Sequence, residues 1–305
     1  CFGNSTKVDG MDQASENHST TPICDFYQNS TILITGGTGF IGKVLIHKLL
    51  KTFKLRRIYL LIRVKDNMNV NQRLQSFFQE SIFDSIHNDC PELFAKVYPI
   101  HANFSAIDLD ISAHDRATLR DEVEIVFNVV ASVKFNEKLS DAVAINVLGT
   151  KKILDLVMEM KHLKAFLHIS TLYSNCNRKF INERVYEADI GYEKIIQLTR
   201  ILNDGTMKKI QHCLIGEMPN TYTMTKRCSE NLVNHRAFFL PAGIFRPPIG
   251  KKCFCRITCL QLHLRQQQSN LGNVLAAQHP RLYFRFNCHG HWTAKDVRGL
   301  FPVHS

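Results

Sequence analysis

Short apolar runs of strand length alternate along this chain with segments whose apolar residues recur at helical spacing. The runs at 31–34, 58–62, 97–100, 125–130, 165–169 and 242–245 predict strands. Helical spacing recurs between them, as over 70–82 and 143–157, and a long helix is predicted from about Thr223 to Phe239. Because alternating strands and helices are typical of βαβ units, the pattern predicts an α/β protein with a doubly wound parallel sheet.

A glycine-rich segment follows the first predicted strand and leads into a helical segment. It reads Thr35, Gly36, Gly37, Thr38, Gly39, Phe40, Ile41 and Gly42. The first glycine suits a tight turn, the second lets backbone N–H groups approach a pyrophosphate, and the third lets the helix pack closely on the strand. The helix N-terminus adds a partial positive charge. The segment therefore predicts a dinucleotide-binding loop.

The pattern divides the chain into three parts. Residues 1–30 are expected to form a flexible segment, which begins with Cys1, so that Met11 is the expected start of translation. Residues 31–250 are expected to form a Rossmann-type NAD(P)-binding domain. Neither periodicity continues after Ile249, and 251–305 are expected to be an aberrant or disordered tail, from a frameshift or retained intron, rather than a real substrate domain.

Charge, cysteine spacing and the length of apolar runs each argue against one class of function. The net charge is +11, but eight Lys and Arg residues and one Asp give +7 to 251–305, which leaves +4 for residues 1–250. The excess is therefore not a folded basic patch, and no nucleic-acid partner is expected. The ten cysteines show no paired metal-ligand spacing, so no metal site is expected. The sequence has no apolar run of about 18 residues, and a cytoplasmic location is expected.

Tyr222 and Lys226 stand four residues apart at the start of the long predicted helix. This spacing places the phenol and the ammonium on one helical face, where the ammonium is expected to lower the pKa of the tyrosine. Tyr222 is therefore predicted to act as a general acid.

Ser170 and Thr171 follow the predicted strand 165–169. Ligands of open α/β sheets bind beyond the carboxyl ends of the strands, so these hydroxyls are expected to face the crevice. One of them can donate a hydrogen bond to a carbonyl oxygen that gains charge.

Cofactor choice depends on the end of the second predicted strand. A carboxylate at this place would bind the ribose diol of NAD, whereas this chain has Arg63 and Lys65. Two cations suit a 2′-phosphate, so NADPH is the expected cofactor.

Taken together, these motifs resemble the extended short-chain dehydrogenase/reductases and, within them, the fatty acyl-CoA reductases. The narrower resemblance extends over about residues 24–250 and rests on the segments 25–27, 61–63, 126–135, 146–150, 168–175, 219–226 and 245–247. It departs from the family at Asn128, where the family usually has His, and at Ala102-Asn103, where it usually has Gly-Asp.

The resemblance implies NADPH-dependent reduction of a long-chain fatty acyl-CoA, through a bound aldehyde, to a fatty alcohol. Tyr222 would protonate the oxyanion, Lys226 would hold the nicotinamide ribose, and Thr171, in preference to Ser170, would polarise the carbonyl. Asn146 and Pro247 would contact the cofactor. Full-length members of the family are associated with the peroxisomal or endoplasmic reticulum membrane. The C-terminal substrate part of the family is expected to be largely missing here.

Two alternatives remain open from the sequence. One is another extended reductase that acts on a sterol, a sugar nucleotide or a flavonoid. The other is a cofactor-binding fragment without turnover.

Overall fold

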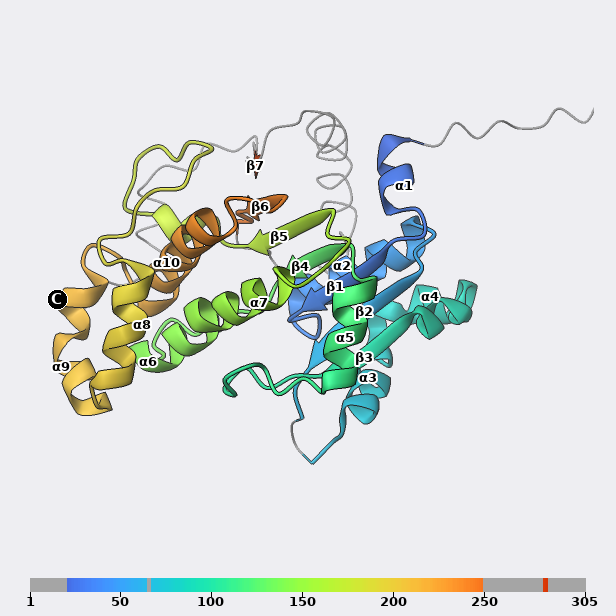
Figure 1. Cartoon of the computed structure of the whole chain (residues 1–305), viewed down its shortest axis with the longest axis horizontal. Helices are drawn as coiled ribbons and strands as arrows, with labels where there is room; N and C mark the ends of the chain where they lie inside the picture. The colour runs from blue at the N-terminus through green and yellow to red at the C-terminus, as the bar shows by residue number, and fades with distance from the viewer. Residues whose placement is uncertain (1–20, 65–66, 249–281, 285–305) are drawn as a thin grey trace, which may run out of the picture.

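The protein is described by a computed structural model, which covers residues 21–64 and 67–248 and the backbone of 282–284 (Figure 1). The strands form one parallel sheet in the order β3-β2-β1-β4-β5-β6-β7. Their bounds are β1 Thr31–Thr35, β2 Arg57–Ile62, β3 Val97–His101, β4 Ile125–Asn128, β5 Ala165–Ile169, β6 Ala242–Phe245 and β7 Leu282–Phe284. The first six strands confirm the predicted doubly wound parallel sheet, in which the order reverses between β1 and β4.

Helices cover both faces of the sheet. The α-helices are α1 Pro22–Tyr27, α2 Phe40–Thr52, α3 Val70–Phe78, α4 Asp84–Asp89, α5 Ala113–Glu122, α6 Leu139–Ala142, α7 Gly149–Val157, α8 Tyr192–Ile201, α9 Asp204–Ile215 and α10 Thr221–Arg236. Short turns of other helical types are η1 Ser81–Phe83, η2 Pro91–Lys96, η3 Val143–Leu148 and η4 Leu172–Asn175. In Figure 1, α8, α9 and α10 lie together on the left, away from α3 and α4 on the right.

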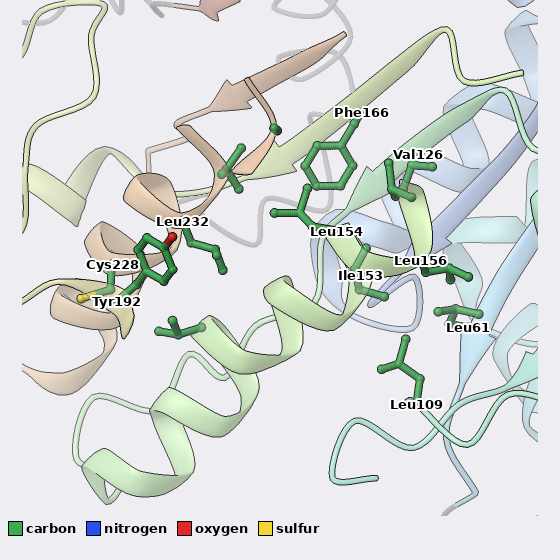
Figure 2. Close-up of a cluster of buried hydrophobic side chains, with 14 of the residues drawn as sticks. Leu61, Leu109, Val126, Ile153, Leu154, Leu156, Phe166, Tyr192, Cys228 and Leu232 are labelled. Atoms are coloured by element: carbon green, nitrogen blue, oxygen red, sulfur yellow. The ribbon is translucent and has the colours of Figure 1, made fainter. Parts of the chain in front are cut away.

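Alternation along the strands divides the core between the two faces. Ile32 and Ile34 of β1 point into a cluster with α1, α2, α3 and α4. Leu33, between them, belongs to a second cluster with α5, α7, α8 and α10. Figure 2 shows side chains of this second cluster, among them Leu154 of α7 and Leu232 of α10. Strands that are buried on both faces explain the continuous apolar runs of the sequence.

Three elements differ from the expected boundaries. The flexible segment expected to continue to residue 30 is replaced over Pro22–Tyr27 by α1, since Thr21 caps this helix and Ile23 and Tyr27 are buried. Strand β4 ends at Asn128 rather than at 130, because the next two backbone N–H groups donate to the Thr35 hydroxyl. Helix α10 begins at Thr221, since the Asn220 side chain accepts from the N–H of Thr223.

The structure describes only a part of the predicted tail 251–305. Residues 282–284 form β7, which pairs in parallel with β6 and which the sequence pattern does not predict. The remaining residues of 251–305, and residues 1–20, lie outside the described residues.

Candidate active site

The loop between β1 and α2 has contacts that a side chain at its glycines would prevent. Gly36 has a φ of +65°, and a Cβ on it would lie 2.6 Å from the backbone nitrogen of Val130. A Cβ on Gly42 would lie 2.4 Å from the Cα of Gly37. The loop therefore makes the tight turn and the close helix packing that a dinucleotide-binding loop requires.

The N-terminus of α2 has no side-chain cap and no acidic residue in its first turn. Its N-cap residue is Gly39, where a Cβ would meet only the carbonyl oxygen of Gly36 within 4 Å, at 3.3 Å. The first backbone N–H groups of a helix have no partner within it and favour an anion. This end of α2 therefore fits the pyrophosphate of a dinucleotide.

The predicted cofactor residues of this loop differ in their exposure. Phe40 and Ile41 are exposed at the start of α2. Thr35 is fully buried, and its hydroxyl donates to Asn128 Oδ1 at 2.8 Å. The Thr35 side chain therefore stabilises the loop from inside the protein, whereas Phe40 and Ile41 are the residues that reach the surface.

The ends of three strands lie side by side. Thr35 of β1 pairs in register with Asn128 of β4, which pairs with His168 of β5. The glycine loop follows Thr35, and Ser170 and Thr171 follow His168 closely. The dinucleotide-type loop and the hydroxyl pair therefore project beyond the same edge of the sheet, at the place where open α/β sheets bind ligands.

Thr171 is the hydroxyl that meets Tyr222. The Tyr222 side chain has a polar interaction with that of Thr171, and its ring lies 5.9 Å from the ring of Phe135, centroid to centroid. Burial raises the pKa of Tyr222, partly opposed by the contact with Thr171. The phenol is therefore protonated at neutral pH, which is the form that a proton donor needs.

Ser170 belongs to a different group of contacts. Its hydroxyl donates at 2.5 Å to Oε1 of Glu230, which is fully buried in α10. Arg246 donates to both oxygens of the same carboxylate, at 2.9 and 2.6 Å, and Ser174 donates to it at 2.7 Å. The structure thus separates the two predicted hydroxyls, one beside Tyr222 and one in a buried ion-pair network.

Lys226 does not act on Tyr222 in the expected way. Its Nζ donates to the carbonyl of Ile169 at 2.6 Å and lies 3.4 Å from Nε2 of His168. The expected lowering of the Tyr222 pKa by this ammonium was wrong, because the lysine is turned towards β5 and burial dominates at the phenol. Burial also lowers the pKa of Lys226, to about 8.

Asn146 and Pro247 connect the chain segments that border the site. The Asn146 side chain is hydrogen-bonded to the backbone of Ser132 at 2.8 and 3.2 Å and to the Thr225 hydroxyl at 2.9 Å. The carbonyl of Pro247 accepts from the N–H of Leu172 at 3.0 Å. Asn146 therefore connects the loop after β4 to α10, and Pro247 connects the segment after β6 to the turn after Thr171.

Beyond β2 the structure adds a cation that sequence reasoning missed. Arg63 is exposed, and Lys65 lies outside the described residues. The guanidinium of Arg73, from α3, donates to the backbone carbonyl of Arg63. The only sequence signal for Arg73 is its place in the first turns of the helix that follows this loop.

Sequence reasoning also missed four buried polar residues behind the site. Glu230 stands four residues after Lys226, and this i, i+4 spacing could have suggested it. Arg246 and His168 lie near the ends of predicted strands and Asn128 lies inside one, yet their partners are 16 to 93 residues away in the chain. No local pattern identifies such pairs.

The fold and the glycine loop define an NAD(P)-binding domain of the Rossmann type. A family model described as Male sterility protein, an NAD-binding family, matches residues 34–251. Because this match covers more than half of its residues, the chain belongs to the Male sterility protein family.

The curated relatives agree with this family. The chain is 40% identical over 228 residues to Fatty acyl-CoA reductase 1 of Xenopus laevis, a match that covers 74% of this chain and 44% of the relative. It is 39% identical over 229 residues to Fatty acyl-CoA reductase wat of Drosophila melanogaster, with 75% and 44% covered. The chain thus spans less than half the length of these relatives.

Among solved structures, the fold is similar to the terminal R domain of the myxalamid PKS-NRPS biosynthetic pathway. The TM-score is 0.51 at 23% sequence identity, with 72% of this chain and 49% of that chain covered. At this identity the likeness confirms the fold.

The described residues contain neither a membrane-spanning helix nor a group of metal ligands. None of the helices in this part of the chain has the length and apolarity needed to cross a bilayer. Within the same residues, His, Cys, Asp and Glu side chains nowhere gather in a group of three that could hold a metal ion.

Proposed function

We propose that this chain is the cofactor-binding and catalytic part of an NADPH-dependent reductase that converts a long-chain fatty acyl-CoA, through a bound aldehyde, to a fatty alcohol. The names of the curated relatives and the membership in an NAD-binding family support this proposal. The contacts at the carboxyl ends of β1 and β5 support the assignment of roles to individual residues.

The glycine loop and the cations beyond β2 would hold the dinucleotide. The uncapped end of α2 suits the pyrophosphate, and Arg63, with Lys65 and Arg73 nearby in the chain or in space, suits a 2′-phosphate. Guanidinium groups bind phosphate through charge-assisted hydrogen bonds. This donor set favours NADPH over NADH.

Tyr222 and Thr171 would act on the carbonyl group of the substrate. NADPH supplies a hydride in each of two reductions. In the first, the thioester carbon is reduced and the CoA thiolate leaves and takes up a proton; in the second, the aldehyde becomes the alcohol. The hydroxyl of Thr171 would stabilise the developing oxyanion, and Tyr222 would donate the proton that completes the alcohol.

The single observation on which these roles most depend is the interaction between the side chains of Tyr222 and Thr171, at the same edge of the sheet as the glycine loop. The test joins this chain to the C-terminal remainder of the Xenopus laevis relative and supplies NADPH and palmitoyl-CoA. Release of CoA thiol together with hexadecanol is the expected result. NADPH binding without either product would favour a cofactor-binding domain without turnover, and oxidation of NADPH only with a sterol or a sugar nucleotide would favour another reductase.

A further inference from the structure

A buried row of polar side chains leads across the sheet to Lys226. Thr35, Asn128 and His168 occupy matching positions on β1, β4 and β5, and all three are 0% exposed. Thr150 of α7 joins them and is equally buried. Buried polar atoms require each donor to meet an acceptor, so these contacts decide which atoms carry hydrogens.

The two threonines fix the side-chain amide of Asn128 in one orientation. The Thr35 hydroxyl accepts the N–H groups of 129–130 at 3.1 and 3.2 Å, so its own proton is donated to Asn128 Oδ1 at 2.8 Å. The Thr150 hydroxyl donates to the carbonyl of Asn146 at 2.7 Å and therefore accepts from Asn128 Nδ2 at 3.3 Å. The amide oxygen must face Thr35, and the nitrogen must face Thr150.

The remaining hydrogen of Asn128 determines the tautomer of His168. Asn128 Nδ2 lies 3.1 Å from Nδ1 of His168, so Nδ1 is the acceptor and the ring carries its proton on Nε2. A doubly protonated ring would set an N–H group against the N–H of Asn128. Burial, the largest cause, also lowers the pKa of His168 well below 6.5. His168 is therefore a neutral donor.

This donor is directed at Lys226. The Nζ atom lies 3.4 Å from Nε2 of His168, and an ammonium group has three hydrogens but no lone pair with which to accept this N–H. A neutral amine can accept it and still donate to the carbonyl of Ile169 at 2.6 Å. Burial lowers the pKa of Lys226 to about 8, opposed in part by Glu230, so the neutral amine is half populated at pH 8 and dominates at pH 9.

We propose that His168 is a positioning residue that, in mildly alkaline solution, favours Lys226 as a neutral amine until the dinucleotide binds, so that binding is coupled to the uptake of a proton at Lys226 Nζ. The inference rests on the proposed function, since it needs a dinucleotide whose ribose hydroxyls and phosphates favour an ammonium. The described ionisable groups that act on Nζ are His168 from β5 and Glu230 from α10. Glu230 is already neutralised by Arg246, so it does not hold the proton on Lys226 by itself.

The experiment is calorimetric titration of this chain with NADPH at pH 8 and pH 9, in buffers with different enthalpies of ionisation. The dependence of the observed heat on the buffer gives the protons taken up. With a free pKa of about 8 and a bound pKa near the ordinary lysine value, uptake should be about half a proton per site at pH 8 and close to one at pH 9. The 2′-phosphate is already fully ionised at these values, because its second pKa is about 6.

Variants assign the proton to the two residues. Lys226→Arg stays charged at these pH values and should bind NADPH without proton uptake. His168→Gln can turn an amide oxygen to an ammonium, so uptake should also disappear. The matched control is His162→Gln at an exposed histidine, which should keep the uptake of the unchanged protein.

The outcomes separate the two proposals. NADPH binding without proton uptake by the unchanged protein overturns this inference, and so does uptake that persists in His168→Gln. If His168→Gln does not fold, Asn128→Asp decides, because its carboxylate would accept Nδ1–H and turn the lone pair of Nε2 to Lys226, so that uptake is lost. Failure to bind NADPH at all would overturn the proposed function and this inference with it.

Discussion

The two halves of the sheet build their parts of the site by different means. Around β1, the glycine loop depends on the close approach of backbone to backbone, and α2 packs on the sheet through apolar side chains. Around β5, α10 buries Lys226, Arg227 and Glu230, and each of them has hydrogen-bond partners. The loop of the first half requires the absence of side chains at its glycines, whereas the second half depends on the identity of individual polar groups.

The largest effect is expected at the side-chain half, from the removal of one oxygen. In the chain completed with the remainder of the Xenopus laevis relative, Tyr222→Phe should lower the rate of alcohol formation by about 10²–10⁴-fold, because a general acid is lost. NADPH affinity should change little. Product analysis and calorimetry measure the two quantities, and a rate loss below tenfold would show that another group donates the proton. Phe135→Leu, which alters only the ring that lies against Tyr222, is the control for packing.

Removal of the buried charge of Glu230 should be the largest effect on stability. Glu230→Gln leaves Arg246 buried without a carboxylate, which should lower the free energy of unfolding by about 3–5 kcal/mol. The matched control is Asp204→Asn, which breaks the exposed pair with Lys138 and should cost far less, because water screens the two charges. Unfolding in urea measures both. Equal losses would mean that the network around Ser170 contributes no more than a surface pair.

In the backbone half, the addition of a single methyl group should be enough to lower both stability and NADPH affinity. Gly42→Ala places a Cβ 2.4 Å from the Cα of Gly37, where neither backbone can give way, and should cost about 1–3 kcal/mol and much of the NADPH affinity. Gly205→Ala is the control, since its Cβ would only reach ordinary contact with Asn203 at 3.4 Å. It should leave NADPH binding unchanged and stabilise α9 by about 0.5–1 kcal/mol. Thermal unfolding measures the stability of the two variants, and titration measures their NADPH affinity. Equal results for the two variants would contradict the special role of the loop glycine.

The most selective effect, confined to one cofactor, is expected where the backbone half uses a side chain. Arg63→Ala should cost about 1.5–3 kcal/mol of NADPH binding, roughly tenfold or more, and leave NADH binding nearly unchanged. The contact of Arg73 is with the Arg63 carbonyl and should survive. Arg56→Ala, at the opposite end of β2, is the control. An unchanged preference for NADPH in Arg63→Ala would remove the basis for the cofactor assignment.

The backbone half could be predicted well from the sequence because its signals are local. Apolar runs located the six strands of the sheet core, with ends within one residue of those observed except at β4. The glycine spacing located a loop whose turn and packing are as expected. In the other half, α10 begins at Thr221 rather than at about 223 because Asn220 caps it, and it ends at Arg236 rather than at Phe239.

The side-chain half could be predicted only in outline. The spacing of Tyr222 and Lys226 places them on one helical face, but the direction of Nζ depends on a carbonyl of β5 that comes 57 residues earlier in the chain. The choice between Ser170 and Thr171 depends on Glu230, which lies 60 residues beyond Ser170. Contacts between residues so far apart in the chain form only when the sheet assembles, so no periodicity in the sequence predicts them.

The buried pair of Glu230 and Arg246 also has a consequence for how the chain folds. Glu230 lies in α10, while Arg246 follows β6, so the carboxylate can leave water at low cost only after β6 has joined the sheet. Docking of α10 is therefore expected to wait for the strand that follows it. During synthesis Tyr222 would emerge before Arg246 and would remain out of place until α10 docks. The site would then be completed in one late, cooperative step that depends on Arg246, a residue that touches no substrate.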